Sequence, residues 1–259
     1  MDLGIKGKQG IVCASSKGLG KACAAALLRE GCDVVINART ETTLLATADE
    51  LSQIGGGQVT PIVADLNTDE GRAKLLASCP NPDILVNNNA GPPPGAFNNW
   101  VEADWQAALQ ANLLAPVFMI QGVLDGMRKR KFGRIVNITS AMVKSPHAAM
   151  GLSTTARSGL TALCKGLSNE SVADNVTINN LLPERFDTDR QKQMAKLMMQ
   201  AQDISYEEAR VAIAGTINAN RFGEPAEFGD ACAYLCSAQA GFISGQNLQL
   251  DGGSYSGLI

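Results

Sequence analysis

The sequence predicts an α/β fold, a doubly wound and mainly parallel seven-stranded sheet with helices on both faces. Its apolar runs are short and continuous rather than alternating, which is typical of strands buried on both faces of a parallel sheet. These runs alternate with amphipathic helical stretches, the order that right-handed crossovers produce. No repeat, low-complexity segment or long linker interrupts the 259 residues, so we expect residues 1–259 to form a single domain.

The elements are expected in regular succession. The Val-, Ile- and Leu-rich runs predict strands at 10–13, 33–37, 59–64, 83–86, 133–138, 176–182 and 247–250. Helical periodicity predicts helices at 19–29, 41–52, 103–130, 152–172 and 225–237, the second of them closed by three glycines. Segment 189–220 breaks the rhythm, with polar edges and several methionines between them. It is either a mobile lid over a substrate or a plain surface helix pair.

Composition excludes several classes of protein. A net charge of -3 provides no basic field, so we expect no nucleic-acid partner. No apolar run reaches the length of a membrane span, and the N-terminus lacks the features of a secretory signal, so we expect a cytoplasmic protein without a membrane partner. The seven cysteines form no metal-type pair and are expected to be reduced core thiols. A single histidine, His147, does not make a zinc site, so no metal is expected.

A glycine-containing turn lies between the first strand and the first helix. It consists of Ser15, Ser16, Lys17, Gly18, Leu19 and Gly20, preceded by Ala14. Small residues at this place let backbone amides approach a pyrophosphate, and the N-terminus of the following helix favours its negative charge. The position in a strand–turn–helix unit at the start of the chain therefore predicts a site for a nicotinamide dinucleotide.

The end of the second strand distinguishes the two nicotinamide cofactors. An acidic residue there would bind the ribose hydroxyls of NAD and repel a 2′-phosphate. The strand instead ends in Asn37 and Ala38 and is followed by Arg39. Arg39 and the turn residue Lys17 are two cations placed to bind that phosphate, although Arg39 facing solvent is the alternative. We therefore expect NADP(H).

Further motifs follow in a definite order along the chain: Asp65-Leu66 after the third strand, Asn88-Asn89-Ala90-Gly91 after the fourth, Asn112 in the long helix, Pro183–Thr188 after the sixth, and Asp251-Gly252-Gly253 near the end. Together with the turn, this pattern resembles that of the classical short-chain dehydrogenase/reductases, close to the 3-oxoacyl-[acyl-carrier-protein] reductase type. The resemblance extends from about Lys8 to Gly253.

The resemblance implies a Rossmann fold, a small-molecule carbonyl substrate and a homotetramer or dimer. It implies that Asn112 and Ser140 are catalytic, Asn112 by holding a water and Ser140 by orienting the carbonyl. It also implies that the cofactor contacts a set of residues at the ends of the third, fourth and sixth strands: Asp65, Leu66, Asn89, Ala90, Gly91 and Thr188.

The sequence departs from the family pattern where the family has its catalytic tyrosine and lysine. Those positions hold Ser153 and Arg157. A serine hydroxyl is a far weaker acid than a phenol and is shorter by a ring. Arginine can still bind ribose hydroxyls but does not release a proton. Glu184 replaces a usual glycine, and its spacing suggests an ion pair with Arg157.

Three functions remain open after this comparison. The chain can be an NADPH-dependent carbonyl reductase that takes its proton from Ser153, from a water held by Ser140 and Asn112, or from His147. It can be an NADPH-binding protein with little or no hydride chemistry, acting as a sensor or assembly partner. The site can also have been adapted to isomerisation, dehydration or imine reduction. The sequence does not identify the substrate.

Overall fold

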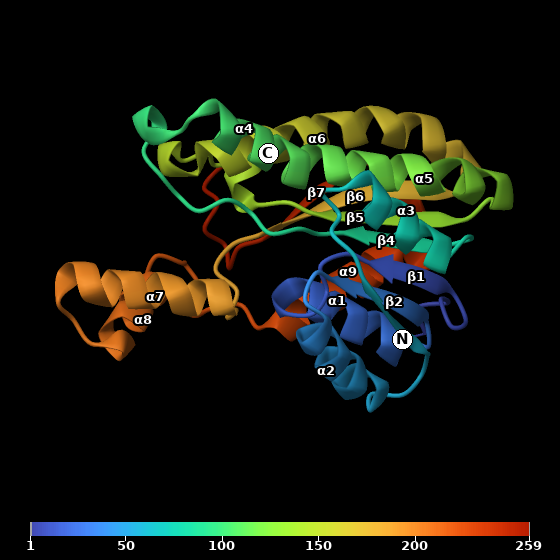
Figure 1. The fold of residues 1–259 in the computed structure, drawn as a ribbon, viewed down its shortest axis with the longest axis horizontal. Coiled ribbons are helices and arrows are strands. Elements are labelled where there is room, and N and C mark those ends of the chain that lie inside the picture. The colour runs from blue at the N-terminus through green and yellow to red at the C-terminus, as the bar shows by residue number, and fades with distance from the viewer. Residues whose placement is uncertain (1, 259) are drawn as a thin grey trace.

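The computed structural model describes residues 2–258, and one seven-stranded sheet runs through them. The strands lie in the order β3-β2-β1-β4-β5-β6-β7, and every neighbouring pair is parallel (Figure 1). Their bounds are β1 (Gln9–Val12), β2 (Asp33–Ala38), β3 (Val59–Val63), β4 (Ile84–Asn87), β5 (Gly133–Ile138), β6 (Val176–Pro183) and β7 (Asn247–Leu250). The predicted fold is thereby confirmed. The strand order reverses between β1 and β4, which is where open α/β sheets bind ligands at their carboxyl edge.

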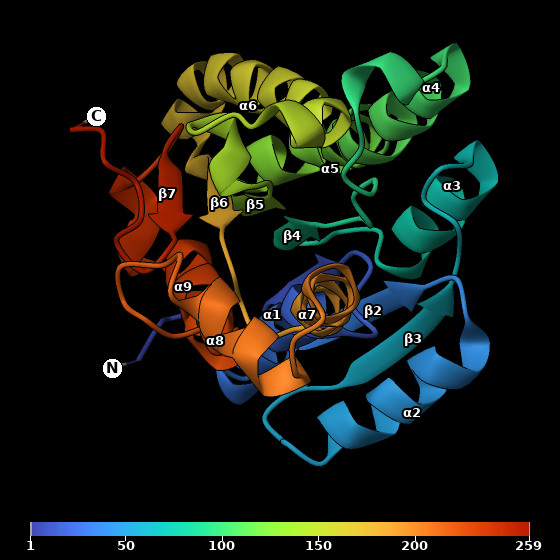
Figure 2. The same ribbon diagram turned by 90° about the vertical axis from the view of Figure 1, so that its left-hand side faces the viewer.

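Helices cover both faces of the sheet (Figures 1 and 2). One face carries α1 (Gly18–Arg29), α2 (Glu41–Ser52) and α9 (Pro225–Cys236); the other carries α3 (Asp69–Ser78), α4 (Glu102–Leu109), α5 (Ala115–Arg130) and α6 (Gly151–Ser171). Fully buried Leu27 and Phe228 pack on the first face, and Met119 and Leu160 pack on the second. The buried apolar clusters therefore hold the strand ends, and with them the site, in fixed positions.

Two features of the helices differ from the sequence prediction. Helix α3 was not predicted, because its sequence is polar and short; its signal is Thr68, whose hydroxyl accepts the Gly71 N–H at 3.0 Å as an N-cap. The helix expected at 103–130 is interrupted by a π-helical turn, Gln110–Leu114. The helical segments from Glu102 to Arg130, counted as one helix, have the length and apolar composition of a membrane span. Core helices of soluble proteins meet the same criterion.

The segment expected at 189–220 forms a helix pair, α7 (Asp189–Gln202) and α8 (Tyr206–Ala214), that projects beyond the carboxyl edge of the sheet (Figures 1 and 2). A small cluster of Ala195, Ala209 and Ile213 lies between the two helices, separate from the two clusters that flank the sheet. The pair is thus attached to the sheet without sharing its core. Its role as a lid remains a prediction.

A row of asparagine side chains crosses four strands beneath the site. Asn87 donates to Asn137 at 2.9 Å, Asn137 donates to Asn180 at 3.0 Å, and Asn180 donates to Asn247 at 2.8 Å. Three of the four are at most 3% exposed. Buried amides are costly unless they are hydrogen-bonded, so a shift in strand register would leave them unsatisfied. The row therefore favours one alignment of β4 to β7.

Candidate active site

The predicted cofactor turn begins directly after β1. Ala14 adopts a left-handed conformation with φ of 44°, and Ser15 behind it is fully buried. The Ser15 hydroxyl donates to the Val12 carbonyl at 2.6 Å and accepts the Asn37 N–H at 3.0 Å, which joins the turn to β1 and β2. Burial raises the pKa of the neighbouring Cys13 thiol to about 12, so this cysteine is not a nucleophile in the site.

Two glycines let the turn pack closely against its neighbours. A Cβ on Gly20 would lie 2.6 Å from the Ala14 oxygen and 2.8 Å from Asn88 Nδ2. Gly18 has φ of 54°, and a Cβ there would lie 3.5 Å from Cγ2 of Thr188. Since α1 starts at Gly18, its first N–H groups have no partner within the helix. This cradle fits the pyrophosphate of a dinucleotide.

The other predicted cofactor residues gather at the same edge of the sheet. Lys17 and Arg39 are both exposed and form no ion pair within residues 2–258. Asp65 and the buried Leu66 follow β3, and the Asp65 carboxylate accepts the Asn67 N–H at 3.0 Å. No acidic side chain follows β2 at the position of Arg39, so the pattern of charges fits a 2′-phosphate.

The segment after β4 borders this cradle. Asn89 donates to the carbonyl of Ala111 at 3.2 Å, which ties the segment to the π-helical turn. Ala90 and Gly91 follow, partly or fully accessible to solvent. Asn88 belongs to the same motif but was not predicted to contact the cofactor site; it donates to the Ala14 carbonyl at 3.0 Å and so connects β4 to the cofactor turn.

Asn112 lies in the π-helical turn, and Pro116 accounts for the turn. Proline has no N–H, so the carbonyl of Asn112 receives no ordinary helical bond from position 116; instead the Ala115 N–H donates to Gln110, five residues back. Asn112 is 3% exposed and donates to the Ala90 carbonyl at 3.3 Å, while its Oδ1 has no hydrogen-bond partner among residues 2–258. Such an unpartnered buried acceptor indicates a missing donor.

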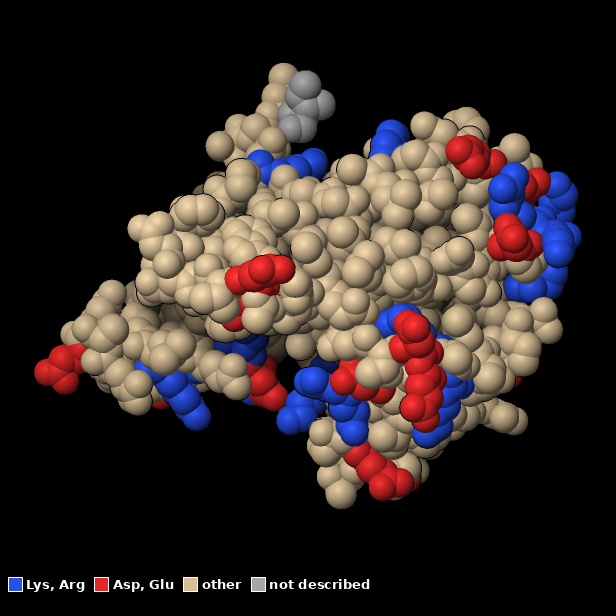
Figure 3. Space-filling model, turned by 45° about the horizontal axis from the view of Figure 1, so that its top comes forward, with Lys and Arg blue, Asp and Glu red and all other residues tan. Residues whose placement is uncertain are grey.

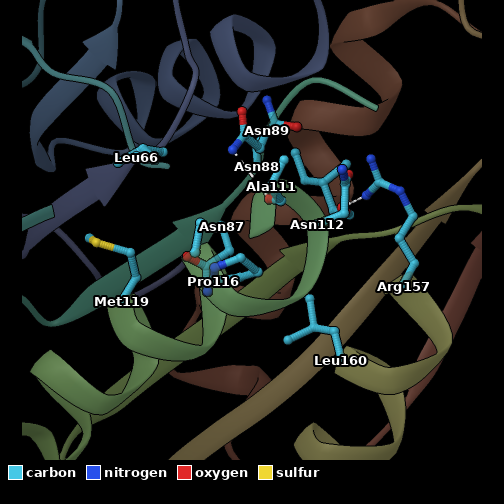
Figure 4. A pocket seen from close by; sticks show the side chains of 12 residues that line it. Leu66, Asn87, Asn88, Asn89, Ala111, Asn112, Pro116, Met119, Arg157 and Leu160 are labelled. Carbon is cyan, nitrogen blue, oxygen red and sulfur yellow. Dashed lines mark hydrogen bonds between the residues drawn. The ribbon is translucent and has the colours of Figure 1, made fainter. Parts of the chain in front are cut away.

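A small cavity adjoins this acceptor. It has a volume of about 10 Å³ and is lined by Asn112, Arg157 and Leu160 together with residues of the β4 end (Figure 4). That volume is close to the space that one water molecule needs, roughly 10–15 Å³. The cavity and the free Oδ1 thus fit the water that was predicted at Asn112.

Ser153 and Arg157 lie side by side on α6, one turn apart. Arg157 Nε donates to Ser153 Oγ at 3.1 Å, and its Nη1 donates to the Ile138 carbonyl at 2.7 Å. Both side chains are buried, at 5% and 9% exposure. Burial, and to a lesser extent the charge of Arg190, lowers the pKa of Arg157 to about 10, so the guanidinium remains charged at neutral pH.

The predicted ion pair between Arg157 and Glu184 is wrong. Arg157 turns toward the Ile138 carbonyl, whereas Glu184 continues the pairing of β6 with β7 through a bond from its N–H to the Leu250 carbonyl at 3.0 Å. Burial raises the pKa of Glu184, and Asp251 raises it further, against the lowering effect of Arg185. Glu184 therefore faces another part of the molecule.

The remaining candidates lie on loops after β5. Ser140 caps a short 3-10 turn, and its hydroxyl accepts the Met142 N–H at 3.2 Å. His147 is exposed, and its Nδ1 accepts the Ala149 N–H at 3.3 Å, which leaves Nε2 as its accessible nitrogen. Ser140 thus lies at the end of a buried strand, and His147 lies at the surface.

Arg190, a residue outside the sequence motifs, also lies at the site. Arg190, in the first turn of α7, donates to the carbonyls of Gly91 at 3.5 Å and Pro92 at 3.3 Å. Gly91 also lies close to Arg157 and Ser153. Nearly one hundred positions separate Arg190 from Gly91, so no local pattern could have indicated this contact.

A parallel sheet with this strand order, a glycine cradle after its first strand and motif residues at its carboxyl edge define a dinucleotide-binding protein of the Rossmann type. A family model described as enoyl-(acyl carrier protein) reductase matches residues 13–255. The chain therefore belongs to this family, within the short-chain dehydrogenases/reductases.

Individual relatives agree with this assignment. NADPH-dependent reductase BacG of Bacillus subtilis is 30% identical, covering 94% of this chain and 96% of its own. The 3-oxoacyl-[acyl-carrier-protein] reductase FabG of Vibrio cholerae is 28% identical, covering 98% and 99%. The crystal structure of L-sorbose reductase from Gluconobacter frateurii, complexed with NADPH and L-sorbose, superimposes with a TM-score of 0.94 at 27% identity over the whole of both chains.

Proposed function

We propose that this chain is an NADP(H)-dependent oxidoreductase that reduces the carbonyl group of a small molecule with an altered proton relay. The observation that carries the proposal is that the segment after β4 contacts both parts of the site: Asn88 donates to Ala14 of the dinucleotide cradle, and Gly91 lies close to the buried Ser153–Arg157 pair. The named activities of its relatives, several of them NADPH-dependent reductases, support the same class of reaction.

The residues present fit NADP(H), which is the cofactor. The turn from Ser15 to Gly20 would hold the pyrophosphate, and Lys17 and Arg39 would hold the 2′-phosphate. Asp65 and Leu66 would border the adenine. The residues that would border the nicotinamide end are Asn89, Ala90, Gly91, Arg157 and Thr188. When bound, the cofactor supplies the hydride that adds to the carbonyl carbon.

In this proposal the Ser153 hydroxyl supplies the proton. Its oxygen accepts from Arg157 Nε at 3.1 Å, so its hydrogen is free to be donated to a carbonyl oxygen. As hydride addition makes that oxygen an alkoxide, proton transfer from serine passes between two aliphatic alcohols and is close to thermoneutral. The charged Arg157 then stabilises whichever of the two oxygens is negative.

Ser153 must regain its proton after each turnover. The cavity beside Asn112 Oδ1 provides room for the water that supplies it, and the Ser140 hydroxyl can orient the substrate carbonyl. His147 is the less favoured donor, since its ring is exposed and its Nδ1 already caps a turn.

Consumption of NADPH with a panel of ketones and quinones tests the proposal. We expect turnover with part of the panel, and Ser153→Ala should reduce kcat by about 10²- to 10⁴-fold while leaving NADPH affinity unchanged. Ser153→Tyr combined with Arg157→Lys should retain carbonyl reduction. NADPH binding without turnover of any compound would instead support a sensor or assembly role. If the protein catalyses isomerisation, dehydration or imine reduction and the double variant lowers that activity, the site has been adapted to another reaction.

We also expect a cytoplasmic homotetramer or dimer. The layer formed by α4, α5 and α6 shows few charged side chains over a broad area (Figure 3) and exposes Leu114, Phe118 and Leu163. A face with few charges and several exposed large apolar side chains is typical of a surface between subunits. Light scattering on the purified protein measures the assembly directly, and a monomer at micromolar concentration would contradict this expectation.

A further inference from the structure

Three donor groups converge on one point beside Gly91. An ideal Cβ built on Gly91 would lie 3.4 Å from Arg157 Nη2, 3.8 Å from Arg190 Nη1 and 3.8 Å from Ser153 Oγ. The ideal Cβ position is within bonding distance of the Gly91 Cα, so it marks the side of Gly91 on which the three groups gather rather than the place of a ligand atom. Because Gly91 has no side chain, none of its own atoms separates the three groups from a ligand on that side. Two guanidinium groups and a hydroxyl are thus directed to the same small space.

The two positive charges are not compensated. Neither Arg157 nor Arg190 forms an ion pair with a carboxylate of residues 2–258, whereas other arginines of the chain, such as Arg210 and Arg221, do. Arg157 is 9% exposed, and its Nη2 has no hydrogen-bond partner among the same residues. A buried cation without a counterion is costly, and two cations that face each other add repulsion. An anion at this point would remove both penalties.

We propose that Arg157 and Arg190 bind the carboxylate of the substrate, which makes the substrate an oxo acid whose carboxylate lies close to the reacting carbonyl. This inference rests on the proposed carbonyl reduction, since the same Ser153 hydroxyl is assigned to the carbonyl oxygen. A 2-oxo or 3-oxo acid places its two oxygen-bearing groups close enough for the carboxylate to bind the arginines while the ketone contacts Ser153. The Nη2 group of Arg157 can bind one carboxylate oxygen and Arg190 the other, both through charge-assisted hydrogen bonds.

Arg190 extends the site to the helix pair. It is the second residue of α7, so an acid held by Arg157 and Arg190 would connect α6 on the sheet to the projecting helices. A substrate that lacks the carboxylate would not make this connection. Selectivity for acids would therefore arise from a residue outside the family motifs.

The test compares 2-oxo and 3-oxo acids with their methyl esters as substrates of the full-length protein with NADPH. Loss of the charged hydrogen bonds should make kcat/KM for the ester about 10- to 100-fold lower than for the acid. Arg190→Met should abolish most of this preference, and Arg190→Lys should restore part of it. Lys196→Met, which removes a charge further along α7, is the matched control and should leave the preference unchanged.

Two further measurements separate the possible failures. If Arg190→Met weakens NADPH binding in a fluorescence titration while the acid-to-ester ratio stays as in the wild type, the anion belongs to the cofactor and the inference is overturned. Equal turnover of acids and esters by the wild type also overturns it, while carbonyl reduction itself stands. If no carbonyl compound is reduced, the proposed function fails. Calorimetry of the same acids and esters with the NADP⁺-loaded protein then tests the anion site on its own. Binding of the acids alone supports the anion site, and equal or absent binding of acids and esters overturns it.

Discussion

Gly20→Ala tests whether the glycine cradle has the close packing described above. The added methyl group would lie 2.6 Å from the Ala14 carbonyl oxygen and 2.8 Å from Asn88 Nδ2, so the turn and the β4 end must move apart. Such overpacking costs about 1–3 kcal/mol. Loss of the bond from Asn88 to Ala14 adds about 1 kcal/mol, and the higher helix propensity of alanine offsets about 1 kcal/mol. We therefore expect a net loss of about 1–3 kcal/mol.

Thermal and denaturant unfolding measure this loss, and an NADPH titration measures its effect on the cradle. For a chain of this size, each kcal/mol lowers the Tm by roughly 2–4 °C. Gly166→Ala is the control. Apart from the adjoining residues and backbone of its own helix, no atom of residues 2–258 lies within 4 Å of the ideal Cβ of this exposed glycine of α6, so alanine should stabilise the helix by about 0.5–1 kcal/mol. A Gly20→Ala protein with the wild-type Tm and NADPH affinity would refute the described packing.

Three further predictions concern single side chains. Arg39→Ala should weaken NADPH binding by about 10- to 100-fold in fluorescence titrations but change NADH binding little, because a charged bond to the 2′-phosphate is lost; equal losses would contradict this role. Asn137→Ala leaves its asparagine neighbours on both sides unsatisfied and should cost about 2–4 kcal/mol in denaturant unfolding; a neutral effect would show that the row does not stabilise the sheet. The hydrogen bond from Arg221 lowers the pKa of Glu227 to about 2. A carboxyl group whose pKa is lowered by folding stabilises the folded state at pH values above its ordinary pKa, and this stabilisation is lost as the pH falls toward the lowered pKa. The Tm difference between wild type and Glu227→Gln should therefore shrink from about pH 6 to pH 3. A constant difference would show that the pair is unimportant.

The sequence predicted the sheet well because its strands are buried on both faces. In the run 133–138, Ile135, Val136 and Ile138 indicated a buried strand, and the structure has that strand at the same bounds with all six residues buried. Helix α3 was not predicted because few of its residues face the core. The π-helical turn was also not predicted, although Pro116 within the long helix was its visible signal.

The sequence predicted those site residues that lie close together along the chain, and it missed a contact between residues that are far apart in sequence. The turn at Gly18 and Gly20 and the neighbours Ser153 and Arg157 lie within short motifs, and the structure brings each pair together. Arg190 was not predicted, because its approach to Gly91 depends on the path of the chain after β6. The incorrect pairing of Glu184 with Arg157 has the same origin, since spacing along the chain does not give the direction of a side chain.

The central claim is that this chain transfers a hydride from NADPH to a carbonyl carbon. Transfer of deuterium tests it most directly: the protein is incubated with NADPH deuterated at the reactive carbon and the carbonyl panel, and the products are analysed by mass spectrometry. We expect one deuterium on the alcohol carbon for each NADPH oxidised, with much slower label transfer for Ser153→Ala. Tight binding of NADPH without label in any product would contradict it.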